Sequence, residues 1–478
     1  MDLRGIFNYI PEVKKPEEKK LSFSVKLKWT LTVLILFFVL TNVSLFGLSN
    51  NALERFEYLA IILGTDFGSI ISLGVGPIVM ASIILQLLTG SGILNIDTTT
   101  SEGKKFFQGL QKLLVLFFIV FEALVYVLMQ GLQAAPGFTY VVIFQLILGG
   151  LAIFYMAEVS EKWGFGSGVS LFIGAGVSWR LMTSAFQFTT QQGRNCLLDF
   201  GATPCPGRIL EVFQAIIGRL GWQAVLSPLL AITATIIVFL IVVWAQSLKV
   251  EVPLSFGKIR GYGVKWPLSF FYASVIPIIL TAALVANLQL FGSLLENVAA
   301  PCSIGACSGM AKFASYFGFL GSFVQGQAVS GLAFWLGSTN LLELVIRGGF
   351  LPIYLVQGLT HVLFFMFFST IFAIFWVKTS GMDSKSQAHK IASSGLQVAG
   401  FRQDERVLES ILDRYILPLT VMGGMAIGLL ASITDLVGAL VSGTAILLVI
   451  MIMFQFYQNI VQQHQTDMNP AMRKFIGS

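Results

Sequence analysis

Charged side chains are scarce in this chain. Asp, Glu, Lys and Arg make up 11% of its 478 residues, whereas soluble domains carry about 25% charged residues. Hydrophobic residues make up 55% of the chain. This composition excludes an ordinary soluble domain and indicates an integral membrane protein. The net charge of +6 is too small to imply nucleic-acid binding by itself.

Several signatures of chemistry are also missing. The chain has only three histidines and four cysteines, and it contains no metal-ligand cluster and no phosphate-binding glycine loop. We therefore expect no metal, no cofactor and no enzymatic activity, so a partner must supply any driving force. The short alternating segments of a membrane barrel are absent as well. Residues 1–28 are charged and interrupted by proline, so we expect no cleavable signal peptide.

What the chain does contain is long apolar runs. Ten of them are long enough to cross a bilayer as helices. They lie near residues 29–49, 71–89, 110–131, 138–158, 167–187, 224–246, 268–291, 355–377, 415–435 and 438–459. The predicted fold class is an all-α integral membrane protein with ten transmembrane helices.

Basic residues set the predicted orientation. If the N-terminus is cytoplasmic and ten spans alternate, most Lys and Arg residues fall in cytoplasmic loops, as the positive-inside rule requires. Both termini are then cytoplasmic. The uncharged stretch 313–342 could pass for an eleventh span, but a further crossing would place the basic residues of 378–414 outside. We interpret this stretch as an external loop, either wholly outside or re-entrant.

The four cysteines agree with this topology. Cys196 and Cys205 follow the fifth span, and Cys302 and Cys307 follow the seventh. Both loops are predicted to be external, where disulfides persist. We favour pairing within each loop. Free thiols are the alternative, and a zinc site is disfavoured because no histidine lies near either pair.

Five spans precede the predicted external hinge loop 188–223 and five follow it. An odd number of spans per half makes the two halves enter the membrane from opposite sides, which is the topology of an inverted repeat. The predicted organisation is a cytoplasmic N-terminal segment, a first half, the hinge loop, a second half and a cytoplasmic tail. Their ranges are 1–28, 29–187, 188–223, 224–459 and 460–478.

One apolar run is broken near its outer end by Gly74, Gly76 and Pro77. Proline removes a helical donor and clashes with the preceding turn. Broken backbone at membrane depth is tolerated only where protein buries it or a cavity meets it. The second span therefore borders something other than lipid.

At this point the motifs resemble those of SecY, the channel subunit of the protein-conducting translocon, in its archaeal and eukaryotic form. The resemblance covers nearly the whole chain, and the order and spacing of ten weak motifs carry it. They include Ile10-Pro-Glu-Val13, Lys26-Leu-Lys-Trp29, Leu73-Gly-Val-Gly-Pro-Ile-Val79, Gln108-Gly-Leu-Gln-Lys112, Gly166-Ser-Gly168 with Leu171-Phe-Ile173, Ala286-Asn-Leu-Gln-Leu290, Phe375-Trp-Val377, Gly400-Phe-Arg402, Arg414-Tyr-Ile416 and Gly438-Ala-Leu440.

The resemblance implies two pseudo-symmetric five-helix halves around a central hourglass pore. Such a channel passes unfolded secretory polypeptides across the membrane and releases membrane-protein segments sideways into the bilayer. Its waist is closed by six aliphatic side chains, which match Val75, Val79, Val169, Ile173, Ile279 and Leu448. A narrow apolar ring resists wetting and so blocks ions. The segment near 58–70 resembles the plug that seals the outer funnel.

The resemblance also implies a lateral gate between spans two and three and spans seven and eight. Glu122 and Asn287 match its polar cluster, and Met80 stands where the family usually has a hydroxyl residue. An ionisable group within a span is a functional candidate by default. A structural glutamate with satisfied partners is the alternative interpretation of Glu122.

Partners follow from the same resemblance. Two cytoplasmic loops carry cations that match the ribosome-docking loops: Lys258, Arg260 and Lys265 in one, and Arg402, Arg406 and Arg414 in the other. Clustered cations suit ribosomal RNA phosphates, although such charge also serves topology alone. The other implied partners are a SecE-like subunit, a second small translocon subunit, a nascent polypeptide with a signal sequence, and membrane lipid. The implied location is an archaeal cell membrane.

Two other function classes, a secondary transporter and an intramembrane protease, fit the sequence less well. A secondary transporter with inverted-repeat topology would place binding charges at mid-membrane, and the spans here are almost free of charge. An intramembrane protease would need a base beside its serine. Ser167 is predicted near the cytoplasmic edge of the membrane and His361 near the external edge, which disfavours that reading.

Overall fold

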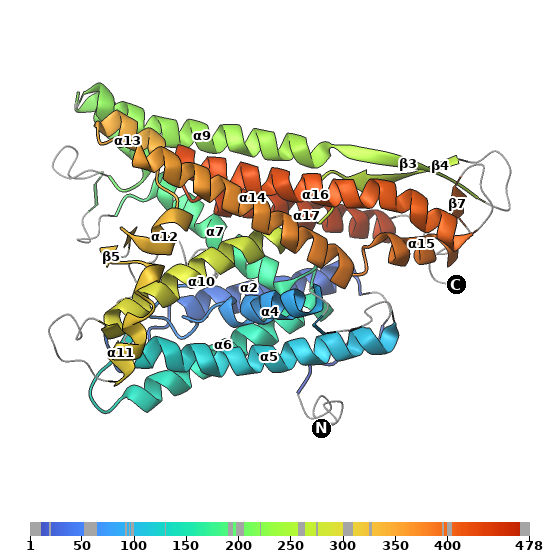
Figure 1. Ribbon diagram of the computed structural model, residues 1–478, viewed down its shortest axis with the longest axis horizontal. Coiled ribbons are helices and arrows are strands. Elements are labelled where there is room, and N and C mark those ends of the chain that lie inside the picture. The colour runs from blue at the N-terminus through green and yellow to red at the C-terminus, as the bar shows by residue number, and fades with distance from the viewer. Residues whose placement is uncertain are drawn as a thin grey trace.

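The computed structural model is mostly helical, and its long helices run side by side along the longest axis of the molecule (Figure 1). It describes the chain except for residues 1–10, 19–20, 52–64, 91–92, 95, 97–99, 130, 190–194, 197–204, 220, 257–262, 274–275, 300–308, 325–326, 394–395, 399–403 and 469–478.

Nine helices in the described ranges are long and apolar enough to cross a membrane. They are α2 (Phe23–Thr41), α5 (Ser101–Leu128), α6 (Thr139–Trp163), α7 (Gly168–Phe186), α9 (Trp222–Ser247), α10 (Ile276–Ala299), α14 (Ile353–Thr379), α16 (Glu405–Val437) and α17 (Gly443–Met468).

The remaining predicted span corresponds to α4 (Gly76–Gly90), which has 15 residues. At 1.5 Å per residue it is about 22 Å long, shorter than the hydrocarbon core of about 30 Å. The residues of the predicted span that precede Gly76 form a compact turn and not a helix. All ten predicted spans therefore contain a helix, but one of these helices is too short to cross alone.

Two predicted spans are displaced along the chain. The first, 29–49, begins and ends too late, because α2 ends at Thr41 and β1 (Leu48–Asn51) pairs with β2 (Leu132–Ala134). The seventh, 268–291, begins too early, because β4 (Gly263–Ser269) pairs with β3 (Lys249–Phe256) and α10 starts only at Ile276. In both cases backbone pairing between strands competes with an apolar run that also suits a helix.

The two ends of the helix bundle differ (Figure 1). One end, here called the β3–β4 end, carries the antiparallel sheet β4-β3-β7, with β7 at Leu396–Val398, and the short helix α15 (Ser384–Ser393). The opposite end, called the α11–α13 end, carries short elements between α10 and α14. They are α11 (Gly309–Ser315), η3 (Gly318–Leu320), β5 (Phe323–Val324), β6 (Gln327–Ala328), α12 (Gly331–Leu336) and α13 (Leu341–Arg347). In agreement with the prediction, the described part of 313–342 forms no spanning helix.

The main apolar core lies where the two predicted halves meet. It joins side chains of α2, α4, α5, α6 and α7 to side chains of α10 and α17. Helix α7 packs against α17, and α4 contacts both α10 and α14. A second, smaller core lies under the sheet at the β3–β4 end, where Val252 and Leu268 meet Ala388 of α15 and Leu412 of α16.

Candidate pore and lateral gate

All six predicted pore residues belong to the main apolar core or pack against it. Five of them are buried in this core, and the sixth, Val169, is partly buried and packs against it. They come from four helices and their immediate approaches: Val75 and Val79 at the start of α4, Val169 and Ile173 in the first turns of α7, Ile279 on α10, and Leu448 on α17. Helix α10 contacts both α4 and α17. The predicted pore residues thus lie on helices of both halves that pack together in one apolar core, as a water-excluding constriction requires.

The chain enters α4 through a tight turn. Gly74 has φ of +53°, a conformation that glycine adopts at little cost and other residues avoid. Helix α4 begins at Gly76, and Pro77 occupies its second position. The first amides of a helix have no intrahelical acceptor, so proline costs little there. The predicted break in the second span is confirmed, and it lies at the helix start.

The last part of the predicted plug is folded onto this turn, while residues 58–64 lie outside the described ranges. The hydroxyl of Ser72 donates to the carbonyl of Ser69 (2.5 Å) and accepts from the amide of Gly68 (2.9 Å). The amide of Ile70 donates to the carbonyl of Val43 (2.9 Å). Hydrogen bonds therefore close the turn internally and join it to the segment after α2.

Helix α6 fits closely against the same turn. A Cβ atom placed on Gly149 would lie 1.9 Å from the carbonyl oxygen of Ile70. Ile71 and Leu73 are completely buried. Only a glycine allows α6 to approach the turn this closely, so this part of the predicted plug is held against the first-half helices.

Two of the predicted gate residues, Glu122 and Asn287, are buried, but no hydrogen bond joins them. Asn287 donates from Nδ2 to the carbonyl of Ala283 on its own helix (2.8 Å). Glu122 is 1% exposed, and neither of its carboxyl oxygens has a hydrogen-bond partner among the described residues. Met80 is partly buried against the main core. Burying a carboxyl group without a partner is costly, so the structure does not support the alternative that Glu122 has satisfied structural partners.

Two further residues near the predicted gate helices were not found from the sequence. Tyr126 lies one turn after Glu122, is completely buried, and its hydroxyl has no partner among the described residues. The spacing of four residues on α5 is the signal that could have found it. Across the seam between α4 and α14, a Cβ on Gly90 would lie 2.5 Å from the ring of Phe375. The close approach of Phe375 to Gly90 is one of the places where the two predicted halves touch.

The comparisons with known proteins agree with this geometry. The SecY family model matches residues 69–457. The protein translocase subunit SecY of Methanothermobacter thermautotrophicus is 40% identical over 482 residues, covering 99% of this chain and 98% of the relative.

The chain belongs to the SecY family.

Solved structures give the same result for the fold. A protein-conducting channel matches with a TM-score of 0.80 at 34% identity and covers 99% of this chain and 100% of the other. Sec61 in the canine ribosome-channel complex from the endoplasmic reticulum matches with a TM-score of 0.77 at 33% identity, with the same coverage. The SecY fold therefore extends over essentially the whole chain.

The basic loops of this SecY-family chain are described only in part. Lys258, Arg260 and Arg402 lie outside the described residues. Arg406 and Arg414 are exposed on α16. Lys265 of β4 forms an ion pair with Glu251 of β3 (2.6 Å). The hydrogen bond to Glu251 raises the pKa of Lys265, and the carboxylate of Glu251 offsets part of the lysine's charge within the hairpin.

The cysteines of the SecY-family chain divide in the same way. Cys196 and Cys205 form a disulfide with Cα atoms 5.4 Å apart, as predicted, and both are buried. Cys302 and Cys307 lie outside the described residues, so their pairing stays a prediction. The disulfide closes the loop between α7 and α8 (Arg208–Ile217), at the junction of the two predicted halves.

Proposed function

We propose that the chain is the channel subunit of a protein-conducting translocon. It passes unfolded secretory polypeptides across the membrane and releases membrane-protein segments laterally into lipid. The observation that carries this proposal is that six aliphatic side chains from both halves of the chain share one apolar core. Membership of the SecY family supports it.

In the resting channel the six side chains act as a seal. Their apolar surfaces exclude water and so deny ions a hydrated path. They carry no charge that would bind a passing polypeptide, so the ring can part and close around an extended chain. The turn at residues 65–75, which leads from the predicted plug into α4, covers the seal from the α11–α13 side.

Lateral release requires α4 and α5 to separate from α10 and α14. The contact of Phe375 with Gly90 then breaks, and Glu122 and Tyr126 become accessible to a segment that enters the opening. Their lack of partners in the closed state supports a role in this step. A signal sequence that offers hydrogen bonds or polar backbone would find acceptors and donors there.

The topology we propose places both termini and the β3–β4 end in the cytoplasm of an archaeal cell, with the disulfide outside. Arg406 and Arg414 then face the cytoplasm, where they are available to ribosomal RNA. A SecE-like subunit and a second small subunit complete the complex. The ribosome or another cytosolic partner supplies the driving force, and the chain itself acts as a channel and not as an enzyme.

Site-specific crosslinking tests the pore. Cysteine is placed at Val75 or Ile279 in a chain carrying Cys302→Ser and Cys307→Ser, and a secretory nascent chain with one cysteine is stalled in the channel. We expect disulfide crosslinks at both positions and none from Leu229→Cys, which is exposed on α9. Stalled chains that crosslink to Leu229→Cys but to neither pore position would contradict the assignment.

A further inference from the structure

The C-terminal end of α12 is bonded to a spanning helix. The last carbonyl groups of a helix have no partner within it, and here three of them receive hydrogen bonds from side chains of α14. Phe334 O accepts from Gln357 Nε2 (2.8 Å), Trp335 O from Thr360 Oγ1 (2.9 Å), and Leu336 O from His361 Nδ1 (2.7 Å). Side chains of another helix thus replace the water that would serve these carbonyls at an exposed surface.

The donors lie below the end of the spanning helix. Helix α14 starts at Ile353, so Gln357 and His361 are its fifth and ninth residues. At a rise of 1.5 Å per residue they lie about 6–12 Å inside the end of the helix. Both side chains are buried. Backbone groups at membrane depth must be paired within the protein, and the end of α12 meets this condition.

The outer side of the same segment is apolar. Residues 313–342 contain no charged side chain. Their exposed large side chains include three aromatic rings, and Tyr316 is 73% exposed. The set is Phe313, Tyr316, Phe319, Val324, Val329 and Leu332. Clusters of exposed apolar side chains are unusual in water, and exposed aromatic side chains are typical of the membrane interface.

Helix α14 carries a second exposed apolar surface, which we expect to face lipid. Leu355, Leu359, Leu363 and Phe367 follow at intervals of four residues and are exposed, so they form one stripe along the helix. Helix α11 packs against α10, and α12 packs against both α10 and α14 (Figure 1). Lipid that covers the stripe on α14 would therefore also meet the segment between α10 and α14.

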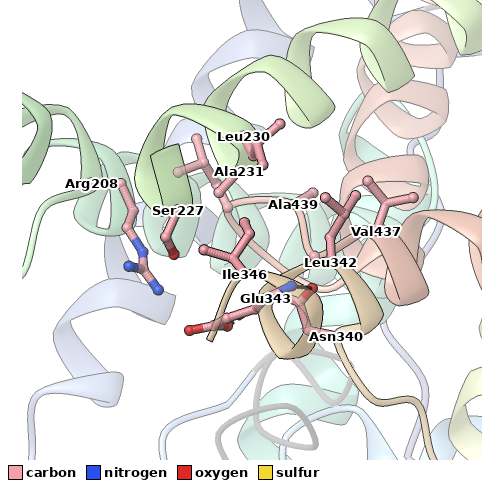
Figure 2. A pocket seen from close by; sticks show the side chains of 12 residues that line it. Arg208, Ser227, Leu230, Ala231, Asn340, Leu342, Glu343, Ile346, Val437 and Ala439 are labelled. Carbon is pink, nitrogen blue, oxygen red and sulfur yellow. Dashed lines mark hydrogen bonds between the residues drawn. The ribbon is translucent and has the colours of Figure 1, made fainter. Parts of the chain in front are cut away.

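Along the chain, the next charged side chain after Lys312 is Glu343 on α13. Figure 2 shows Asn340 and Glu343 of this region with Arg208 of α8 around a cavity of about 60 Å³. Glu343 pairs with the exposed Arg347 (2.5 Å). A charged pair of this kind is stable in water and costly in lipid. Helix α13 therefore marks the water side of the segment.

We propose that the segment from Phe313 at the end of α11 through η3, β5 and α12 forms a re-entrant element that lies in the outer leaflet and contacts lipid with its exposed aromatic and aliphatic side chains. The element does not cross the membrane. It enters beside the external end of α10, pairs the end of α12 with α14, and returns to water at α13. It covers the external end of the α10–α14 pair, the second-half side of the gate, so lipid in the outer leaflet contacts this element beside the gate.

Spin-label accessibility tests this placement. The full chain, with Cys302→Ser and Cys307→Ser and the subunits that co-purify with it, is reconstituted in liposomes. Single nitroxides are attached at Tyr316→Cys and Phe319→Cys. Leu363→Cys, on the lipid-facing stripe, and Arg347→Cys, on α13, are the matched controls. Collisions with molecular oxygen, which partitions into lipid, are compared with collisions with a water-soluble nickel complex.

We expect the oxygen-to-nickel ratio at positions 316 and 319 to exceed one, as at position 363, and the ratio at position 347 to fall below one. A ratio below one at both test positions would place the segment in an aqueous vestibule and overturn the proposal. Low accessibility to both reagents would show that another protein chain covers the surface, and would overturn it equally. Both test side chains are exposed, so neither cysteine removes a core contact. The measurement does not depend on polypeptide transport.

Discussion

Lys112 of α5 and Glu158 of α6 form an ion pair, with 2.6 Å between Nζ and Oε1. Glu158 also pairs with Lys162 (3.0 Å) and accepts through Oε2 from the amide of Val13 (3.1 Å). Glu12 bonds to the same two lysines. The segment around residues 12–14 is therefore fastened across the ends of two spanning helices by one buried carboxylate.

Replacing Glu158 by Gln should destabilise this end of the molecule. Glu158 is 7% exposed, and removing one member of a buried ion pair costs about 3–5 kcal/mol, because the partner charges remain. We expect a lower midpoint of thermal unfolding in detergent for Glu158→Gln. The exposed Glu161, on the same helix, provides the control, and Glu161→Gln should leave the midpoint nearly unchanged. Equal midpoints for the two variants would show that the network contributes nothing.

Acid should release the N-terminal segment. The hydrogen bond from Lys162 lowers the pKa of Glu12 below its usual value of 4.5, against the opposing effect of burial, and Lys112 lowers it further. A carboxyl group with a lowered pKa stabilises the folded state above its unfolded pKa, and this stabilisation is lost as pH falls through the folded-state value. Attachment of the segment should therefore be complete above pH 4.5 and weaken below it.

A nitroxide at Lys15→Cys, in the Cys302→Ser and Cys307→Ser background, reports this release. Its spectrum should change from restricted to mobile as pH is lowered from neutral through the folded-state pKa of Glu12, which lies below 4.5. The Glu12→Gln variant should show a much smaller change over this range. A transition of the same size in both chains would mean that Glu12 does not control attachment.

The sequence was sufficient for features that depend on composition and periodicity. Apolar runs predicted all ten helical segments, and the Gly-Pro pair at Gly76 and Pro77 predicted the break before α4. Helix bounds were less certain where an apolar run also suits a strand. Near Leu48 and Leu268 the partner strands β2 and β3 determine the outcome, and no local pattern in the sequence reveals that pairing.

Contacts between distant segments were the part that the sequence could not supply. The ion pair of Glu12 with Lys162 joins residues 150 positions apart. In the sequence, the charges near Glu12 are typical of any cytoplasmic segment. The approach of Gly149 to Ile70 likewise depends on how α6 packs against the turn. The pore residues were assigned through the family resemblance, since each is an ordinary aliphatic side chain in an apolar helix.

A side chain at position 149 should disturb the closed channel. Alanine is the better helix former by about 1 kcal/mol, so Gly149→Ala would stabilise α6 if space allowed. Its Cβ would instead press against the carbonyl of Ile70. We expect Gly149→Ala to displace the turn before α4 and to increase resting ion conductance in planar bilayers. Gly166→Ala is the control, because its Cβ would have only ordinary contacts at 3.7 Å or more. Unchanged conductance in Gly149→Ala would mean that the turn does not contribute to the seal.

A polar side chain in the constriction should hydrate it. Ile173 is completely buried in the apolar cluster, and an unpaired amide there costs about 1–3 kcal/mol in the dry state. Water entering the ring would relieve that cost. We expect Ile173→Asn to conduct ions at rest, measured as dissipation of a potassium gradient in proteoliposomes, while Ile173→Val stays tight. If both variants are tight, Ile173 lies outside the seal.

His361 connects α12 to the second-half core. Its Nδ1 lies 2.7 Å from Leu336 O, and a carbonyl can only accept, so Nδ1 carries the proton. Its Nε2 lies 3.7 Å from the carboxylate of Asp435, beyond hydrogen-bond distance, and that carboxylate accepts from the amide of Gly443 (2.7 Å) at the start of α17. His361→Leu leaves the Leu336 carbonyl unpaired, at a cost of about 1–3 kcal/mol. His361→Asn can place its amide nitrogen near the position of Nδ1 and keep that hydrogen bond.

We therefore expect faster proteolytic cleavage between α12 and α14, relative to the native chain, in His361→Leu and substantially less acceleration in His361→Asn. Equal cleavage rates in the two variants would show that the hydrogen bond to Leu336 does not hold α12 in place.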